Sequence, residues 1–205
     1  MKTKLIEKDR IEEIADLLRE GKLVAFPTDT VFGLACVYDN EVAIQTMKMA
    51  KERPDSKPFP LMVGSKEQIS TIALVDDRCA NIIEKWMPGA LTLVMKKKES
   101  VPAFVTNGEE TIAVRMADDE FVLSLINAVG KPLLVTSANI SNQPAATCDS
   151  EAQAQLNGRI DGIVIGNSLG ARASTIIDVT KDELVVLREG PISLDRILFT
   201  LREER

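Results

Sequence analysis

Short apolar runs alternate with segments of helical spacing along this chain, and proline, glycine or polar residues separate them. The predicted strands are residues 23–26, 60–63, 91–95, 111–115, 133–136, 162–165, 175–179 and 184–187. The predicted helices are residues 41–51, 76–86, 118–129, 149–156 and 193–201. Mixed strands and helices predict an α/β fold. Because their order is not a strict βαβα alternation, we expect a mixed sheet with helical cover.

The length of 205 residues predicts one domain, residues 1–205, with no linker inside it. The formal net charge of −6 makes the chain a poor candidate for indiscriminate nucleic-acid binding, because such binding depends on phosphate neutralisation. A local basic cleft is still compatible with this total, since fields follow the arrangement of charges.

The chain has no histidine, which excludes Ser-His-Asp and Cys-His catalysis and the common histidine-ligated zinc sites. Its three cysteines form no CxxC pair and are interpreted as reduced thiols. The first ten residues lack an apolar signal core, and no apolar run is long enough to span a membrane. We therefore expect a cytoplasmic protein that does not enter a membrane. Neither a P-loop nor a dinucleotide-binding fingerprint occurs.

Polar segments follow or end the apolar strands, where α/β proteins tend to keep their sites. The segment 27–30 (PTDT) either holds a small polar substrate or is a proline turn whose side chains satisfy their own backbone. The segment 51–58 carries Lys51, Arg53 and Lys57 between prolines. It suits a polyphosphate, or it is the solvated end of a helix.

Two further segments offer an arginine and a cluster of hydroxyls. Arg115 ends an apolar strand and must find an anion, because burying an unpaired charge is costly. That anion is either a ligand carboxylate or a structural Asp or Glu. The hydroxyl-rich segment 135–141 is either a loop that approaches a ligand or an ordinary Ser/Thr turn. Ser174 and Arg188 add another hydroxyl and another strand-end arginine.

Taken together and in this order, the segments resemble the YrdC-type L-threonylcarbamoyladenylate synthase family. The resemblance rests on PTDTVFGLA, KERPDSKP, PGALTLV, TIAVR, VTSANIS, STIID and LREG, and runs from about residue 21 to residue 190. It implies a YrdC-like fold, a twisted α/β sheet with a large concave, positively charged cavity. Longer relatives carry an extra C-terminal domain, and this chain is similar to the short, single-domain form.

The resemblance also implies an activity, that of a nucleotidyltransferase. The family condenses L-threonine, bicarbonate or CO2, and ATP into L-threonylcarbamoyl-AMP and pyrophosphate. The product serves the synthesis of N6-threonylcarbamoyladenosine at position 37 of tRNA. The implied cofactor is Mg²⁺, held through the ATP phosphates and not by protein side chains. The implied further partners are the downstream threonylcarbamoyl transferase proteins, in transient contact, and tRNA in the basic cavity.

Motif by motif, the resemblance assigns residues to two substrates. Those implied to bind L-threonine are Thr30, Arg115, Ser137 and Ser174. Those implied to bind ATP are Lys51, Arg53, Lys57, Thr111, Val135, Asn139, Ser141, Ala145 and Arg188, with Val135 and Ala145 acting through backbone groups. Lys51 and Arg53 are also the expected catalytic pair, because cations neutralise the charge that builds on the phosphates.

At several positions the chain departs from the family pattern. Asp29 stands where many members have Glu, and Phe32 where many have Tyr. Met62 replaces a histidine found in some members, Ala117 a common proline and Asn142 a common glycine. We interpret these as changes in the shape of the site without loss of activity.

Two other functions are compatible with the sequence. The first is an RNA-binding module of YrdC-like fold that acts in tRNA or ribosome maturation without catalysis. Such a module needs cations but has no use for hydroxyls and an arginine that converge on an amino acid. The second is a carbamoyl-handling domain of larger hydrogenase-maturation proteins, whose acylphosphatase-like and zinc-finger parts have no counterpart in this sequence.

Overall fold

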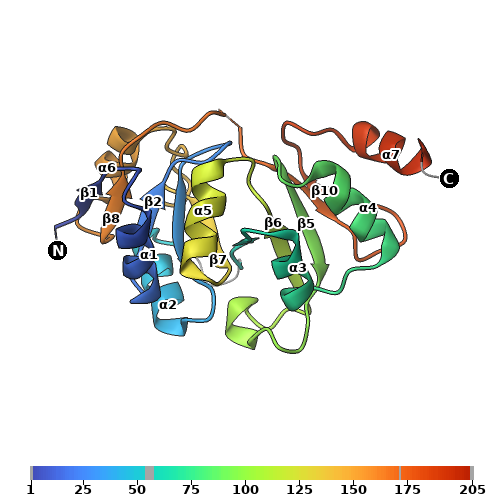
Figure 1. Cartoon of the computed structure of the whole chain (residues 1–205), viewed down its shortest axis with the longest axis horizontal. Coiled ribbons are helices and arrows are strands. Elements are labelled where there is room, and N and C mark those ends of the chain that lie inside the picture. Colours follow the sequence, from blue (N-terminus) through green and yellow to red (C-terminus); the bar gives the residue numbers. More distant parts are fainter. Residues whose placement is uncertain (1, 54–57, 171, 204–205) are drawn as a thin grey trace.

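The computed structural model describes residues 2–53, 58–170 and 172–203. The strands in these ranges are β1 (Lys4–Ile6), β2 (Val24–Phe26), β3 (Gly33–Val37), β4 (Leu61–Met62), β5 (Leu91–Lys96), β6 (Thr111–Arg115), β7 (Leu133–Ser137), β8 (Gly162–Val164), β9 (Thr175–Asp178) and β10 (Val185–Arg188). They form one sheet in the order β1-β8-β2-β3-β7-β4-β6-β5-β9-β10. The start of β1 and the end of the last helix lie at opposite ends of the molecule (Figure 1).

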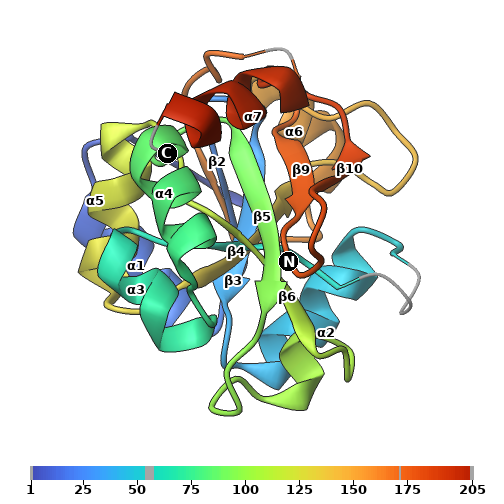
Figure 2. The same ribbon diagram turned by 90° about the vertical axis from the view of Figure 1, so that its right-hand side faces the viewer.

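The helices lie on both sides of this sheet. They are α1 (Ile11–Arg19), α2 (Glu41–Ala50), α3 (Lys66–Ile72), α4 (Asp77–Trp86), α5 (Glu120–Val129), α6 (Asp149–Leu156), α7 (Leu194–Glu203) and the short 3-10 helix η1 (Ala103–Val105). Figure 2 shows α1, α3, α4 and α5 to the left of the central strands β3 and β5, and α2 and α6 to their right. None of the described helices combines the length and apolarity that crossing a membrane requires.

Strand pairing confirms the mixed sheet. Parallel pairs join β1 to β8, β8 to β2, β4 to β6 and β5 to β9. The other neighbours, including β2–β3, β3–β7 and β5–β6, are antiparallel. The predicted α/β fold with helical cover is therefore correct.

Side-chain caps mark where helices begin, and a glycine marks where one of them ends. Asn40 accepts a bond from the Ala43 amide at the start of α2, 3.0 Å away, and Asp76 accepts one from the Cys79 amide at the start of α4, at 2.7 Å. Gly130 ends α5 with φ of 79°, a left-handed conformation that favours glycine.

The core consists of two clusters of buried apolar side chains. The larger joins α2, α3, α4 and α6 to the central strands. The smaller joins α1 and α5 to β2, β3 and β7. Because both clusters pack against the same sheet, the ends of its central strands are held at fixed positions, and those ends carry the polar segments described above.

All thirteen predicted elements are present, with bounds shifted by at most two residues. Five further elements are present that the sequence pattern did not predict: β1, α1, β3, α3 and η1. Three of these, β1, α3 and η1, are short, so their patterns carry little signal. The strand β3 has the sequence GLACV and is buried along its whole length, so it lacks the alternation of a half-buried strand.

Candidate active site

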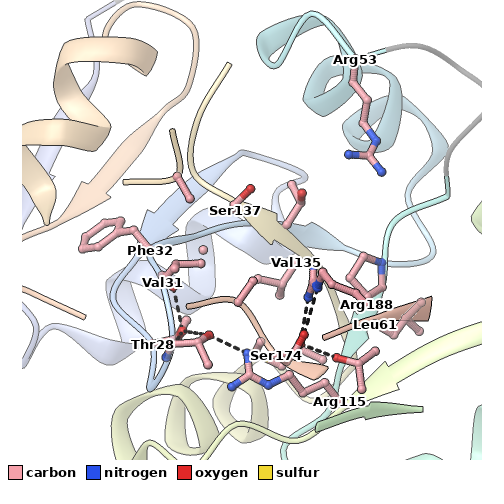
Figure 3. Close-up of a pocket in the computed structure, with 18 residues that line it drawn as sticks. Thr28, Val31, Phe32, Arg53, Leu61, Arg115, Val135, Ser137, Ser174 and Arg188 are labelled. Atoms are coloured by element: carbon pink, nitrogen blue, oxygen red, sulfur yellow. Dashed lines mark hydrogen bonds between the residues drawn. The ribbon is translucent and has the colours of Figure 1, made fainter. Parts of the chain in front are cut away.

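Side chains from the ends of several strands meet around a cavity of about 240 Å³ (Figure 3). The loop between β2 and β3 forms one wall, the ends of β6 and β7 form the next, and the segment before β9 lies across from them. The lining residues are Thr28, Thr30, Val31, Phe32, Gly33, Arg53, Pro60, Leu61, Met62, Thr92, Arg115, Val135, Thr136, Ser137, Ala145, Ala173, Ser174 and Arg188. This volume is below the roughly 300–1,000 Å³ typical of pockets for drug-sized ligands, so it suits a group of about amino-acid size.

Arg115 is the most buried cation of the cavity, with 6% of its surface exposed. Its Nη2 lies 2.5 Å from Asp29 Oδ1, its Nη1 donates to Thr30 Oγ1 at 2.8 Å, and its Nε donates to the Gly89 carbonyl at 3.1 Å. The structural carboxylate that the sequence left as one alternative is therefore present, in Asp29. The arginine side chain still faces the cavity, where a ligand carboxylate, the other alternative, would bind. One N–H on each terminal nitrogen has no partner among the described residues, which leaves two donors for a ligand.

The threonines of the 27–30 segment are held by each other. Thr28 Oγ1 lies 3.2 Å from Thr30 Oγ1, donates to the Val31 carbonyl at 2.8 Å and accepts from the Thr30 amide at 3.1 Å. Local turn bonds therefore do exist here. They fix the Thr30 hydroxyl beside Arg115, so the turn also shapes the cavity wall.

On the opposite wall a hydroxyl pair connects to a second arginine (Figure 3). Ser174 Oγ lies 2.8 Å from Thr92 Oγ1 and accepts from Arg188 Nη2 at 3.1 Å. Arg188 Nε also donates to the Ser174 carbonyl at 2.9 Å. Arg188 keeps three N–H groups without a partner among the described residues, so an anion in the cavity can be bound by this side chain as well.

The local charge of the cavity is opposite to that of the chain. Arg53, Arg115 and Arg188 line it, and no carboxylate does among the described lining residues. Burial lowers the pKa of Arg115 and of Arg188, and the charge of Arg115 lowers the pKa of Arg188 further. Two guanidinium groups close enough to repel each other favour the binding of an anion between them.

An apolar wall lies next to these charges, made by Leu61, Met62 and Val135. Gly33 is needed there because a Cβ at this position would lie 2.8 Å from Val135 Cγ1. The cavity thus offers cations, hydroxyls and an apolar wall within a small volume.

Lys51 follows α2 and is buried, with 1% of its surface exposed. Its Nζ donates to the Asn139 carbonyl at 2.7 Å and to the Ser137 carbonyl. Its own carbonyl accepts from the Ser141 amide at 2.7 Å, a bond that joins the same two segments. Burial and, to a smaller extent, the charge of Arg53 lower the pKa of Lys51 to about 7. The side chain does not line the cavity: it ties the loop after β7 to the end of α2.

The other residues predicted for ATP fall into three groups. Arg53, Val135, Ala145 and Arg188 line the cavity. Asn139 and Ser141 lie on the loop held by Lys51, and the Asn139 Oδ1 and Ser141 Oγ atoms are buried without a hydrogen-bond partner among the described residues. Thr111 lies at the far end of β6 from Arg115, about 13 Å along the same strand face. Lys57 lies outside the described residues.

The guanidinium of Arg53 is itself held in place. It lies over the Phe59 ring, 4.6 Å from the centroid, and its Nη2 donates to the Pro58 carbonyl at 3.2 Å. Burial lowers its pKa. The arginine thus reaches the cavity from the side of α2, opposite the hydroxyl pair (Figure 3).

The residues predicted to bind L-threonine all line this same cavity. They are Thr30, Arg115, Ser137 and Ser174. Sequence reasoning missed Thr92, which is buried and lines it too. Strand alternation carried the signal: Leu91 and Leu93 point into the core, so Thr92 points to the other face, and it pairs directly with Arg115 on β6.

The fold and the cavity define an α/β protein with a polar, arginine-rich pocket at the ends of its central strands. The sequence pattern of the Sua5/YciO/YrdC family, described as Telomere recombination, matches residues 16–190. The chain belongs to this family.

Several relatives bear the name threonylcarbamoyl-AMP synthase. The protein from Pyrococcus abyssi is 37% identical over 203 residues, which are 98% of this chain and 59% of the relative. The protein from Bacillus subtilis is 36% identical over 191 residues, 92% of this chain and 55% of the relative. The protein from Vibrio cholerae is 34% identical over 186 residues, 89% of this chain and 98% of the relative. The chain thus spans little more than half of the first two proteins and nearly all of the third.

Solved structures show the same fold. Sua5 of P. abyssi, crystallised in complex with L-threonine, matches with a TM-score of 0.92 at 36% identity, over 97% of this chain and 61% of that one. YciO of E. coli matches with a TM-score of 0.87 at 25% identity, over 95% of this chain and 99% of that one. The predicted family and its twisted mixed sheet are confirmed.

Proposed function

We propose that this chain is an L-threonylcarbamoyladenylate synthase, which condenses L-threonine, bicarbonate or CO2, and ATP into L-threonylcarbamoyl-AMP and pyrophosphate. The observation that carries the proposal is Arg115, a buried arginine with two N–H donors to spare in a cavity of amino-acid size. Relatives named threonylcarbamoyl-AMP synthase and a neighbour solved with L-threonine support it.

In this proposal the amino acid binds by its two ends. The spare donors of Arg115 bind its carboxylate, and charge-assisted bonds of this kind are about twice as strong as neutral ones. The hydroxyls of Thr30, Ser137 and Ser174 surround its polar groups, and the apolar wall contacts its methyl group. A methyl group in such a pocket discriminates by about 1–3 kcal/mol, so L-serine should be a poorer substrate.

ATP is too large for a cavity of this volume, so in the same proposal only its phosphates enter, on the side that Arg53 and Arg188 line. Backbone groups of Val135 and Ala145 contact the nucleotide. The buried, unpartnered oxygens of Asn139 and Ser141 support a ligand or water near the loop after β7. The family resemblance further assigns ATP contacts to Lys51, Lys57 and Thr111. Two N–H groups of the Lys51 ammonium donate to backbone carbonyls, and the third is the one that would contact ATP.

The chemistry needs no nucleophile from the protein. The amine of threonine attacks CO2, a C–N bond forms, and a proton is lost to give the carbamate. A carbamate oxygen then attacks the α-phosphorus of ATP in line as the bond to pyrophosphate breaks. The arginines neutralise charge on the transferring and leaving groups, which is the main contribution that proteins make to phosphoryl transfer.

Magnesium belongs to the proposal as a companion of ATP. Within the described ranges no three His, Cys, Asp or Glu side chains are grouped to hold a metal ion. The donor set of the cavity is cationic and suits phosphate oxygens, so we propose that Mg²⁺ is held by the ATP phosphates, where it would neutralise charge on the leaving group. Use of the product in tRNA modification, contact with transferase proteins and tRNA, and a cytoplasmic location are further parts of this proposal.

Pyrophosphate release from ATP and Mg²⁺ tests the proposal, with L-threonine and bicarbonate added singly and together. We expect release to require both, and L-serine to substitute poorly. Arg115→Gln should lower kcat/KM for L-threonine by about 10- to 100-fold, the worth of a hydrogen bond to a charged group. Arg10→Gln, at a surface arginine paired with Glu13, is the matched control.

Release that does not depend on threonine would refute the amino-acid site. The RNA-binding alternative then predicts RNA affinity that falls steeply with salt concentration.

A further inference from the structure

Among the described residues that line the cavity, Asp29 bonds through its side chain to Arg115. Its side chain is about as buried as that of Arg115, with 10% and 7% exposed. It is absent from the cavity lining, yet its Oδ1 lies 2.5 Å from Arg115 Nη2. The direct contact of this carboxylate with the cavity wall is therefore its bond to the arginine.

The guanidinium of Arg115 is held from three directions. The Gly89 carbonyl accepts from Nε, Thr30 Oγ1 accepts from Nη1, and Asp29 Oδ1 accepts from Nη2. Asp29 is the only charged group of the three, so it is the strongest anchor. With all three bonds in place, the plane of the guanidinium and the direction of its spare donors are fixed before a ligand arrives.

The carboxylate of Asp29 is anchored as well. Its Oδ2 accepts from the Asp118 amide at 3.1 Å, in the segment between β6 and α5. The chain also crosses directly over its backbone at Gly170, where a Cβ would lie 2.8 Å from the Asp29 carbonyl oxygen. The Arg115 guanidinium and the Asp118 amide thus each hold one oxygen of this carboxylate, and the close approach of Gly170 confines the backbone that carries it.

We propose that Asp29 is a positioning residue, which holds the Arg115 guanidinium so that its two spare N–H groups point at the carboxylate of the amino-acid substrate. The inference rests on the proposed function. An arginine held in its binding geometry loses less conformational entropy when the ligand binds, so the ligand binds more tightly.

The test compares binding of L-threonine with binding of L-threoninamide, which lacks the carboxylate charge, by calorimetry. The wild-type protein should prefer L-threonine by about 10- to 100-fold, the range for bonds to charged groups. Asp29→Asn keeps the shape of the side chain and loses its charge. We expect its preference to fall below about threefold, and KM for L-threonine to rise while KM for ATP stays within about twofold.

Three further variants complete the design, the last as a substitute for Asp29→Asn. Asp29→Glu keeps the carboxylate and should restore most of the preference. Asp118→Asn removes a neighbouring exposed carboxylate whose backbone, not its side chain, contacts Asp29, and it should behave as wild type. If Asp29→Asn does not fold, Asp29→Ser carries the same expectation, because it places no amide hydrogens against the guanidinium.

A folded Asp29→Asn or Asp29→Ser variant that keeps the wild-type preference would overturn the inference, and so would an equal rise of both KM values in that variant. Failure of the proposed function looks different, since the wild-type protein would then neither prefer L-threonine nor release pyrophosphate in its presence.

Discussion

Replacement of Lys51 by methionine gives a stability effect that depends on pH. The ammonium is buried against the carbonyls of Ser137 and Asn139. Methionine has a similar length and no charge, so Lys51→Met removes the two bonds while it fills most of the space. The variant should unfold with a different pH profile from the wild-type protein.

The sign and size follow from the lowered pKa of Lys51, about 7 in the folded protein against 10.5 for the unperturbed group. Below pH 7 both the folded and the unfolded chain carry the proton. Between the two pKa values only the unfolded chain does, so the free energy of unfolding rises with pH. From pH 7 to pH 9 this amounts to about 2 kcal/mol, which the methionine variant lacks.

Urea unfolding of both proteins at pH 7, 8 and 9 measures this difference. The wild-type protein should gain about 2 kcal/mol on the variant over that range. Lys4→Met, at a lysine whose side chain is 58% exposed, controls for the loss of one positive charge. A difference between wild type and Lys51→Met that stays constant with pH would refute the buried, proton-releasing ammonium.

Three further substitutions distinguish residues that affect substrate binding in the cavity from a residue that affects only the stability of the fold. Ser174→Ala removes the hydroxyl that joins Arg188 to the amino-acid side, so KM for L-threonine and for ATP should rise together, each roughly fivefold in steady-state assays. Gly170→Ala places a Cβ against the Asp29 carbonyl and should raise KM for L-threonine and lower the melting temperature. Arg78→Met removes bonds to three carbonyls of the turn between β9 and β10, away from the cavity. It should cost about 1–3 kcal/mol in urea unfolding with both KM values unchanged.

The sequence predicted most of the fold because strands and helices with a clear period are also the ones that pack in the core. The helix α5 illustrates this: Asp119 caps its start, Gly130 ends it, and its buried residues recur at helical spacing. The strand β3, which was not predicted, has no such periodic pattern of buried residues. Small residues and burial on both faces leave it without a period, although it pairs with β2 and β7.

The cavity was predicted as a set of residues, but not as a network of contacts. The residues alone left the anion of Arg115 open, and the family resemblance implied the substrate carboxylate. Neither indicated Asp29, because spacing along the chain does not show that this residue, far away in sequence, lies beside the arginine. It also assigned Lys51 to the phosphates. The structure buries that side chain against loop carbonyls, a contact that depends on how α2 and β7 pack. Tertiary packing decides both cases.

Formation of the adenylate itself tests the central claim most directly. The purified protein is incubated with ATP, Mg²⁺, labelled bicarbonate and differently labelled L-threonine, and the nucleotide products are separated. The account predicts one adenylate that carries both labels, formed in step with pyrophosphate. Release of pyrophosphate without a doubly labelled adenylate, or no release at all, would contradict it.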